Sequence, residues 1–329
     1  MLPDIYIRGL GVCWPSPTPI TEPIADGLYD DAQAARTQYT SVCVEDKRAA
    51  PELAVLAAAD AMASSDVTPD SIEAVFYAHA HRLPLDIWNP AGYVARELHV
   101  TSSSLTTIGG GCAAGVGALQ VASAFLAAGF TDTALVTAAD CWPAEHVDRY
   151  RADAGLVFAD GAAAAVLTRT PGPLQLLSAC SAGDPQLEPL HRGEDEWYSE
   201  RPDLVRRARS FRSVMATVST KRHLVTGLRA TVNRVLAEAG VQSADRLASV
   251  LLPGIGADLF STNYLRPLRI AEDRTNLQFA RTTGHLGAAD QLAALTAAVS
   301  SGTLTSGDLI LLVGEGTGFS WSAAVVQVA

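Results

Sequence analysis

A glycine-rich turn that holds one cysteine is the chemically most distinctive feature of the sequence. Residues 109–115 read Gly-Gly-Gly-Cys-Ala-Ala-Gly, and the apolar residues of 115–129 recur with the period of a helix. This order predicts that Cys112 lies at the N-terminus of the helix, where unpaired N–H groups and the helix dipole favour a thiolate. The glycines permit a sharp turn and a close approach of substrate. We therefore interpret Cys112 as an acyl-accepting nucleophile and not as a structural cysteine.

A second glycine turn precedes a helical pattern late in the chain. Residues 284–287 read Gly-His-Leu-Gly, the pattern predicts a helix over 286–302, and Asp290 lies in its first turns. Taken singly, His285 is explained as a polar capping residue and Asp290 as a first-turn carboxylate that the helix dipole favours. Taken with Cys112, they form a nucleophile, a general base and a carboxylate that fixes the imidazole tautomer. We predict that the three residues are catalytic.

The elements around the two turns occur in the same order in each half of the chain. Almost continuously apolar strands alternate with helices, which favours a mostly parallel sheet covered on both faces. This α/β repeat predicts two pseudo-symmetric halves, residues 1–172 with the nucleophile and residues 173–329, with a site where they meet. The predicted strands are 1–12, 71–81, 131–140, 161–170, 246–254, 307–316 and 320–328, and the further predicted helices are 51–65 and 223–240.

A polar stretch, residues 184–222, interrupts the second half and is predicted to be an insertion that covers or flanks the site. Its segment 201–212 contains five arginines in an otherwise acidic protein. The simple interpretation is a solvated helix face. The functional one is a docking surface, made by Arg206, Arg207 and Arg209, for a phosphate-bearing or acidic donor.

Composition excludes several classes of function. The net charge of −11 argues against a nucleic-acid partner, and no apolar run of the 329 residues is long enough to span a membrane. The N-terminus lacks the regions of a signal peptide. The five cysteines are scattered without the spacing of a metal site, so no metal is expected. Their odd number and wide spacing fit free thiols in the reducing cytoplasm.

Two further motifs carry a resemblance to a known family. Residues 155–167 resemble the Phe-Gly-Asp-Gly-Ala segment of 3-oxoacyl-ACP synthase III, with Ala159 in place of the first glycine, and residues 311–326 resemble its terminal glycine loop and last strand. With the Cys112 turn, these motifs identify the chain as a member of the thiolase superfamily. The resemblance implies a five-layered αβαβα fold and a homodimer. It also implies an acyl-CoA or phosphopantetheinyl-ACP donor, with no permanently bound cofactor.

The departures from this family concern its condensing machinery. Pro253-Gly254-Ile255-Gly256 stands where condensing synthases carry His-Gln-Ala-Asn, and His285 stands where they carry Asn. The missing groups stabilise the enolate formed when malonyl loses carbon dioxide, and each such donor is worth roughly 3 kcal/mol. The pattern resembles the synthase-III-like acyltransferases of polyketide-antibiotic pathways, which use Cys, His and Asp to move an acyl group without condensing it.

The sequence thus predicts an acyltransferase that carries its acyl group on Cys112 and passes it to a hydroxyl of a secondary metabolite, a sugar or a polyketide scaffold. Three alternatives remain: transfer between carrier proteins or starter-unit priming of a polyketide synthase, a condensing synthase, and an inactive partner subunit. The intact Cys112 argues against the last of these.

Other positions receive lesser roles. The glycine loop of Gly316, Thr317 and Gly318 is expected to bind the oxyanion of the tetrahedral intermediate with its backbone N–H groups. Trp142 is expected to form a wall of the acyl pocket. Glu315, directly before the loop, is either a simple loop charge or a replacement for a structural contact.

Overall fold

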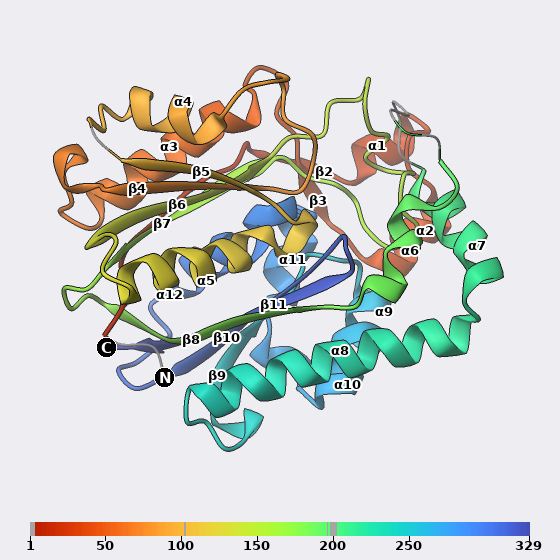
Figure 1. The fold of residues 1–329 in the computed structure, drawn as a ribbon. Helices are drawn as coiled ribbons and strands as arrows, with labels where there is room; N and C mark the ends of the chain where they lie inside the picture. The colour runs from red at the N-terminus through yellow and green to blue at the C-terminus, as the bar shows by residue number, and fades with distance from the viewer. Residues whose placement is uncertain (1–3, 102, 196, 198–202) are drawn as a thin grey trace.

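The computed structural model describes residues 4–101, 103–195, 197 and 203–329 (Figure 1). The first three residues of the predicted N-terminal strand and Arg201 of the arginine-rich segment lie outside these ranges. Within them, one nine-stranded sheet runs through the molecule in the order β5-β4-β6-β7-β1-β8-β11-β10-β9. A small second sheet pairs β2 (Pro17–Pro19) with β3 (Ser41–Cys43). In sequence order the strands of the large sheet are β1 (Tyr6–Cys13), β4 (Ala74–His79), β5 (Ser104–Gly109), β6 (Thr133–Asp140), β7 (Gly161–Thr168), β8 (Leu174–Gly183), β9 (Leu247–Leu251), β10 (Leu309–Gly316) and β11 (Ser320–Val328).

The prediction of a mostly parallel sheet is wrong. The pairs β4–β5, β4–β6 and β9–β10 are parallel, whereas β6–β7, β7–β1, β1–β8, β8–β11 and β11–β10 are antiparallel. The prediction of parallel pairing came from the continuous apolar runs of the strands. Every residue of β7 is buried, and such a run indicates that both faces of a strand are covered, whichever way its neighbours run.

Helices cover both faces of each half and fill the space between them (Figure 1). Helices α3 (Ala50–Ala63) and α4 (Pro90–Glu97) pack on the outside of the first half, and α8 (Thr217–Glu238) packs on β8 and β11 of the second. Between the halves lie α5 (Ala114–Ala127) and α12 (Asp290–Ser300). The order of layers is αβαβα, as the family resemblance implies. The remaining helices are α1 (Thr21–Ala25), α2 (Asp31–Thr37), α6 (Pro189–Arg192), α7 (Leu204–Val214), α9 (Ala257–Phe260), α10 (Arg266–Leu268) and α11 (Leu277–Thr283).

Small residues let the central helices approach their neighbours closely. Helix α5 buries Ala118 and Ala122 with Val116 and Leu119, and a helix buried on several sides is expected to be apolar all round. A Cβ added at Gly115 would lie 2.1 Å from the backbone oxygen of Ala288, so only glycine fits there. This contact joins the two glycine turns that the sequence singled out.

The predicted elements are present, but the sequence did not reveal β5, β8 or α4. Strand β5 leads into the nucleophile turn and α4 precedes it, whereas the prediction passed directly from the strand at 71–81 to the turn. Strand β8 begins directly after the predicted boundary between the halves and pairs with both β1 and β11, so the two halves share one sheet.

Candidate active site

The two glycine turns have the same local structure. Cys112 lies in a 3-10 turn, Gly111–Ala113, directly before α5, and a matching turn, Gly287–Ala289, follows His285 directly before α12. The first residue of each turn is left-handed, with φ of 61° at Gly111 and 63° at Gly287, a conformation that favours glycine. Cys112 therefore lies in a tight turn directly before the N-terminus of the helix, where the sequence predicts it.

The structure brings together the three residues that the sequence proposed as a set. Cys112 Sγ and His285 Nε2 are 2.8 Å apart although 173 residues separate them in the chain. On the other side of the ring, His285 Nδ1 donates to Asp290 Oδ2 at 2.5 Å. His285 is 1% exposed and Asp290 is 3% exposed, so neither is solvated from outside. The geometry is that of a nucleophile, a base and an orienting carboxylate.

Asp290 is fixed by the backbone as well as by the imidazole. Its Oδ1 accepts a hydrogen bond from Leu286 N at 2.7 Å, and its Oδ2 accepts a second one from Gly254 N at 2.7 Å. The His285 backbone is held in turn, since its N–H donates to Val157 O and its carbonyl accepts from Ala159 N. Neither side chain can rotate away without leaving a buried polar group unpaired.

The charge state of the site follows from these contacts. Burial by itself lowers the pKa of His285, but the negative charges of Asp290 and Cys112, and the hydrogen bonds to both, raise that pKa well above its ordinary value. The imidazolium is thus the favoured form.

The glycine loop packs against the nucleophile turn. A Cβ at Gly316 would lie 2.2 Å from Gly110 O, and a Cβ at Gly111 would lie 2.6 Å from Thr317 N. The loop of Gly316, Thr317 and Gly318 therefore lies beside the Cys112 turn, and the approach requires glycine at position 316. Its role in binding an oxyanion stays a prediction.

A cavity of about 440 Å³ opens onto Cys112 and His285. Trp142 lines it and packs at a tilt against Phe158, with ring centroids 4.2 Å apart, and against His81, with ring centroids 4.7 Å apart. The predicted insertion also contributes to the wall through Leu190, His191, Leu204 and Arg207.

The arginines proposed as a docking surface are largely engaged within the insertion. Arg207 Nε donates to Asp195 at 2.7 Å, Arg206 pairs with the other oxygen of the same carboxylate, and Arg207 Nη1 donates to His191 O. Arg206 and Arg209 are exposed, whereas Arg207 is half-buried and lines the cavity. Arg207 thus differs from its two neighbours, because it contacts the cavity directly.

Two buried carboxylates that the sequence analysis did not use as site residues hold the surrounding loops. Asp140, at the end of β6, accepts hydrogen bonds from the N–H groups of Ala80, His81 and Ala288. Burial raises its pKa to about 6 against these bonds. Asp160 accepts from Trp142 N and pairs with Arg149 at 2.8 Å, which fixes the Trp142 wall. An acidic residue directly after an apolar strand is the only sequence signal for Asp140.

The surroundings of Gly254 leave no room for a side chain of the His-Gln-Ala-Asn motif that condensing synthases carry in place of residues 253–256. A Cβ at Gly254 would lie 2.8 Å from Gly284 O and 3.0 Å from Asp290 Oδ1, so no side chain fits there while Asp290 holds its place. Pro253 lines the cavity but has no N–H and no polar side chain. The enolate donors of a condensing synthase are absent at these positions.

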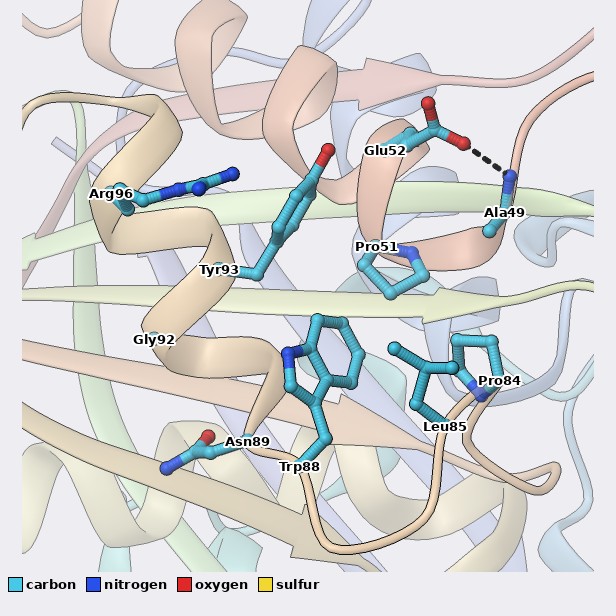
Figure 2. Close-up of a pocket in the computed structure, with 10 residues that line it drawn as sticks. All are labelled: Ala49, Pro51, Glu52, Pro84, Leu85, Trp88, Asn89, Gly92, Tyr93 and Arg96. Carbon is cyan, nitrogen blue, oxygen red and sulfur yellow. Dashed lines mark hydrogen bonds between the residues drawn. The ribbon is translucent and has the colours of Figure 1, made fainter.

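A second hollow, the α4 groove, shares none of its described lining residues with the cavity at Cys112. It has a volume of about 610 Å³ and lies between the start of α3, the loop before α4, and α4 itself. The rings of Trp88 and Tyr93 and the side chain of Leu85 face it (Figure 2). The residues that line it are Ala49, Pro51, Glu52, Pro84, Leu85, Trp88, Asn89, Gly92, Tyr93 and Arg96.

Two sequence profiles of the 3-oxoacyl-[acyl-carrier-protein (ACP)] synthase III family match the chain, one over residues 107–184 and the C-terminal one over residues 236–328. A β-ketoacyl-[acyl-carrier-protein] synthase III of Streptomyces avermitilis is 30% identical over 284 residues, which cover 84% of this chain and 82% of that protein. The chain therefore belongs to the 3-oxoacyl-ACP synthase III family of the thiolase superfamily, and it is an enzyme with acyltransferase or synthase activity.

Solved structures agree with this assignment. ChlB3, an acyltransferase, superposes with a TM-score of 0.95 at 30% identity and covers 99% of this chain and 98% of its own. The 3-oxoacyl-(acyl carrier protein) synthase III of Pseudomonas aeruginosa PAO1 superposes with a TM-score of 0.80 at 22% identity, over 98% of both chains, which shows the shared fold. Among the described residues, no helix is long and apolar enough to cross a membrane.

Proposed function

We propose that the enzyme transfers an acyl group from a CoA or carrier-protein thioester, through acyl-Cys112, to a hydroxyl of a secondary metabolite such as a sugar or a polyketide scaffold. The observation that carries this proposal is the hydrogen-bonded line of Cys112, His285 and Asp290 at the cavity. The similarity to the acyltransferase ChlB3 supports transfer over condensation.

In the first half-reaction, the Cys112 thiolate attacks the thioester carbonyl of the donor. The negative charge moves to the carbonyl oxygen, where backbone N–H groups of Cys112 and of the loop around Thr317 stabilise it. When the intermediate collapses, the carbon–sulfur bond to the donor breaks, and the His285 imidazolium gives its proton to the departing thiolate. The products are acyl-Cys112, a free donor thiol and a neutral imidazole.

In the second half-reaction, neutral His285 takes the proton of the acceptor hydroxyl. The oxygen attacks the acyl carbonyl, an ester bond forms, and the bond to Cys112 Sγ breaks. The cysteine leaves as a thiolate beside the new imidazolium, so the resting ion pair is restored. Asp290 stabilises this imidazolium and keeps the proton-accepting nitrogen directed at the reaction.

Decarboxylative condensation fits the same site poorly. It requires donors that hold the thioester carbonyl of malonyl while the enolate forms. Pro253 and Gly254 offer no such side chain, and His285 Nδ1 is bound by Asp290. The hydrogen-bonded pair of His285 and Asp290 instead suits proton transfer between His285 and an acceptor.

Membership of the family supports two further parts of the proposal, the thioester donor and a cytoplasmic setting. Acyl-CoA or phosphopantetheinyl-ACP is the proposed donor, with no permanently bound cofactor. The five cysteines form no disulfide, which agrees with a reducing cytoplasm.

We also propose a homodimer, formed by a second copy on the β5 edge of the sheet. Strand β5 is one of the two edge strands of the described sheet, and Leu105 on it is 43% exposed. Nearby Leu85 is 58% exposed beside the α4 groove. An edge strand next to exposed apolar side chains is a template for pairing with another chain. Light scattering should show a dimer for the wild type and a monomer for Leu105→Lys.

The test of the proposed function separates the two half-reactions. Purified protein is mixed with acetyl-CoA and a panel of alcohols, and both intact-protein mass and ester products are followed. Cys112→Ala should show no acetyl adduct and no ester, whereas Cys180→Ala, which removes a buried cysteine of β8, should behave as the wild type. His285→Ala should transfer roughly 10²–10⁴-fold more slowly. Ester formation by Cys112→Ala at the wild-type rate would remove the basis of the proposal.

A further inference from the structure

Glu315 is a carboxyl group in the cavity wall that the mechanism above does not use. It lies near the end of β10, directly before the glycine loop. Its Oε1 accepts a hydrogen bond from Trp321 Nε1 at 3.0 Å, and its Oε2 accepts one from the Tyr264 hydroxyl at 2.8 Å. No Lys, Arg or His of the described ranges forms an ion pair with it. Burial raises the pKa of Glu315 to about 7, against the two hydrogen bonds, which lower it.

The pleat of β10 directs this carboxyl away from the nucleophile turn. Gly314 and Gly316 face that turn, since a Cβ at Gly314 would lie 3.0 Å from Ala113 Cα and one at Gly316 would lie 2.2 Å from Gly110 O. Successive residues of a strand point to opposite faces, so Glu315 points the other way. Because Cys112 and Glu315 line the same cavity, the cavity extends around the end of β10. Glu315 therefore lines the part of the cavity that lies on the face of β10 opposite to the nucleophile turn.

The cavity wall consists of two chemically different groups of side chains. One is an apolar cluster of Trp142, Val147 and Phe158, which suits an acyl chain. The other group mixes apolar side chains, among them Leu190, Leu224, Ile255 and Leu259, with the polar groups of Glu315, Tyr264 and His191. Glu315 is hydrogen-bonded to Tyr264 and Trp321. Within the described residues, His191 Nδ1 is buried without a hydrogen-bond partner. The Glu315 carboxyl and the unsatisfied ring nitrogen of His191 are thus polar groups set in a largely apolar wall, where they suit a polar group of a ligand.

The hydrogen-bonding capacity of Glu315 is only half used. An ionised carboxylate has about four acceptor sites, and Tyr264 and Trp321 occupy two of them. Glu315 is half-buried and pairs with no cation of the described residues, so its desolvation costs stability, and an apolar residue of similar size would support the same wall at lower cost. The remaining acceptor sites are therefore best explained by a ligand that donates to them.

We propose that Glu315 accepts a hydrogen bond from a second O–H group of the acceptor, and that it thereby selects polyhydroxylated acceptors over simple alcohols. This inference rests on the proposed function. Glu315 is a specificity-determining residue in this scheme, and it takes no part in the proton transfer at Cys112.

The experiment compares acceptors that differ by one distal hydroxyl. Acetyl-Cys112 is formed from acetyl-CoA, and its discharge by 1-butanol, 1-hexanol and 1-octanol is compared with discharge by the 1,4-, 1,6- and 1,8-diols. Glu315→Gln is the test variant, because its amide can accept from Trp321 and donate to Tyr264, which preserves the wall. Glu238→Gln, at the exposed end of α8, is the matched control.

The wild type should prefer at least one diol over its simple alcohol by roughly tenfold or more, beyond the twofold statistical advantage of two hydroxyls, because a hydrogen bond to a charged group is strong. Glu315→Gln should lose most of this preference while acetyl-Cys112 forms and hydrolyses at the wild-type rate. A wild type without preference, a variant that keeps the preference, or a variant slowed in acetylation would each overturn the assignment. If the wild type forms acetyl-Cys112 but no alcohol discharges it, the proposed function itself fails, and the assignment with it.

Discussion

Replacement of Asp290 by Asn tests the proposed catalytic set most directly, because it removes the charge and keeps the shape. Asp290 Oδ2 accepts from both His285 Nδ1 and Gly254 N, and Oδ1 accepts from Leu286 N. An Asn has only one acceptor oxygen. If that oxygen occupies the Oδ2 position, the amide NH₂ faces the Leu286 N–H, and two donors meet. If it occupies the Oδ1 position, the NH₂ faces the Gly254 N–H and forces His285 Nδ1 to accept.

The second arrangement protonates His285 at Nε2, the atom that must take the proton of the acceptor. A wrong tautomer in the serine-protease triad costs about 10⁴-fold, and general-base catalysis is worth roughly 10²–10⁴-fold. We therefore expect Asp290→Asn to transfer about 10²–10⁴-fold more slowly. The opposed donors should also destabilise the fold by about 1–3 kcal/mol. Formation of acyl-Cys112 from a reactive thioester should change less, since it requires no proton from an acceptor.

Rapid-quench mass spectrometry measures both steps in one experiment. Protein is mixed with acetyl-CoA, the growth of the acetyl adduct is followed, an alcohol is added, and the loss of the adduct is timed. Asp273→Asn, at an exposed position, controls for the loss of one negative charge. Discharge by Asp290→Asn within about threefold of the wild type would refute the role of the carboxylate, provided that the variant is folded.

Two further predictions concern other parts of the site. Malonyl-CoA should label Cys112 without obligatory loss of carbon dioxide, because Pro253 and Gly254 supply no enolate donor. The mass of the adduct and the release of carbon dioxide measure this. Rapid decarboxylation coupled to formation of a carbon–carbon bond would return the enzyme to the condensing synthases. Burial raises the pKa of Glu315 from 4.5 to about 7, so the folded chain holds a proton that the unfolded chain releases, and stability should fall as pH rises between these values. The free energy of unfolding in urea should be measured at pH 5 and at pH 8, and Glu315→Gln should reduce the difference between the two values by up to about 3 kcal/mol. An unchanged difference would contradict the desolvated position of the carboxyl.

Much of the fold was accessible from local pattern. The apolar helices α5 and α12 and the strands β6, β7, β10 and β11 have runs that identify them, and each was predicted within a few residues. Strand β5 was missed because Ser104–Gly109 is polar and partly exposed at the sheet edge, with no buried run to reveal it. Strand direction was misjudged because a buried run contains no information about the neighbouring strand.

The sequence by itself determined the chemistry at each turn: a cysteine and a histidine in equivalent glycine turns, a carboxylate five residues after the histidine, and the absence of the condensing motif. These are properties of neighbouring residues, and the chain displays them directly. Only the tertiary structure decided that Cys112 and His285 meet across 173 residues, that Asp290 is held by Gly254, and that Glu315 shares their cavity. Such contacts depend on how the layers pack, and packing is a sum over many residues far apart in the sequence that no local pattern contains.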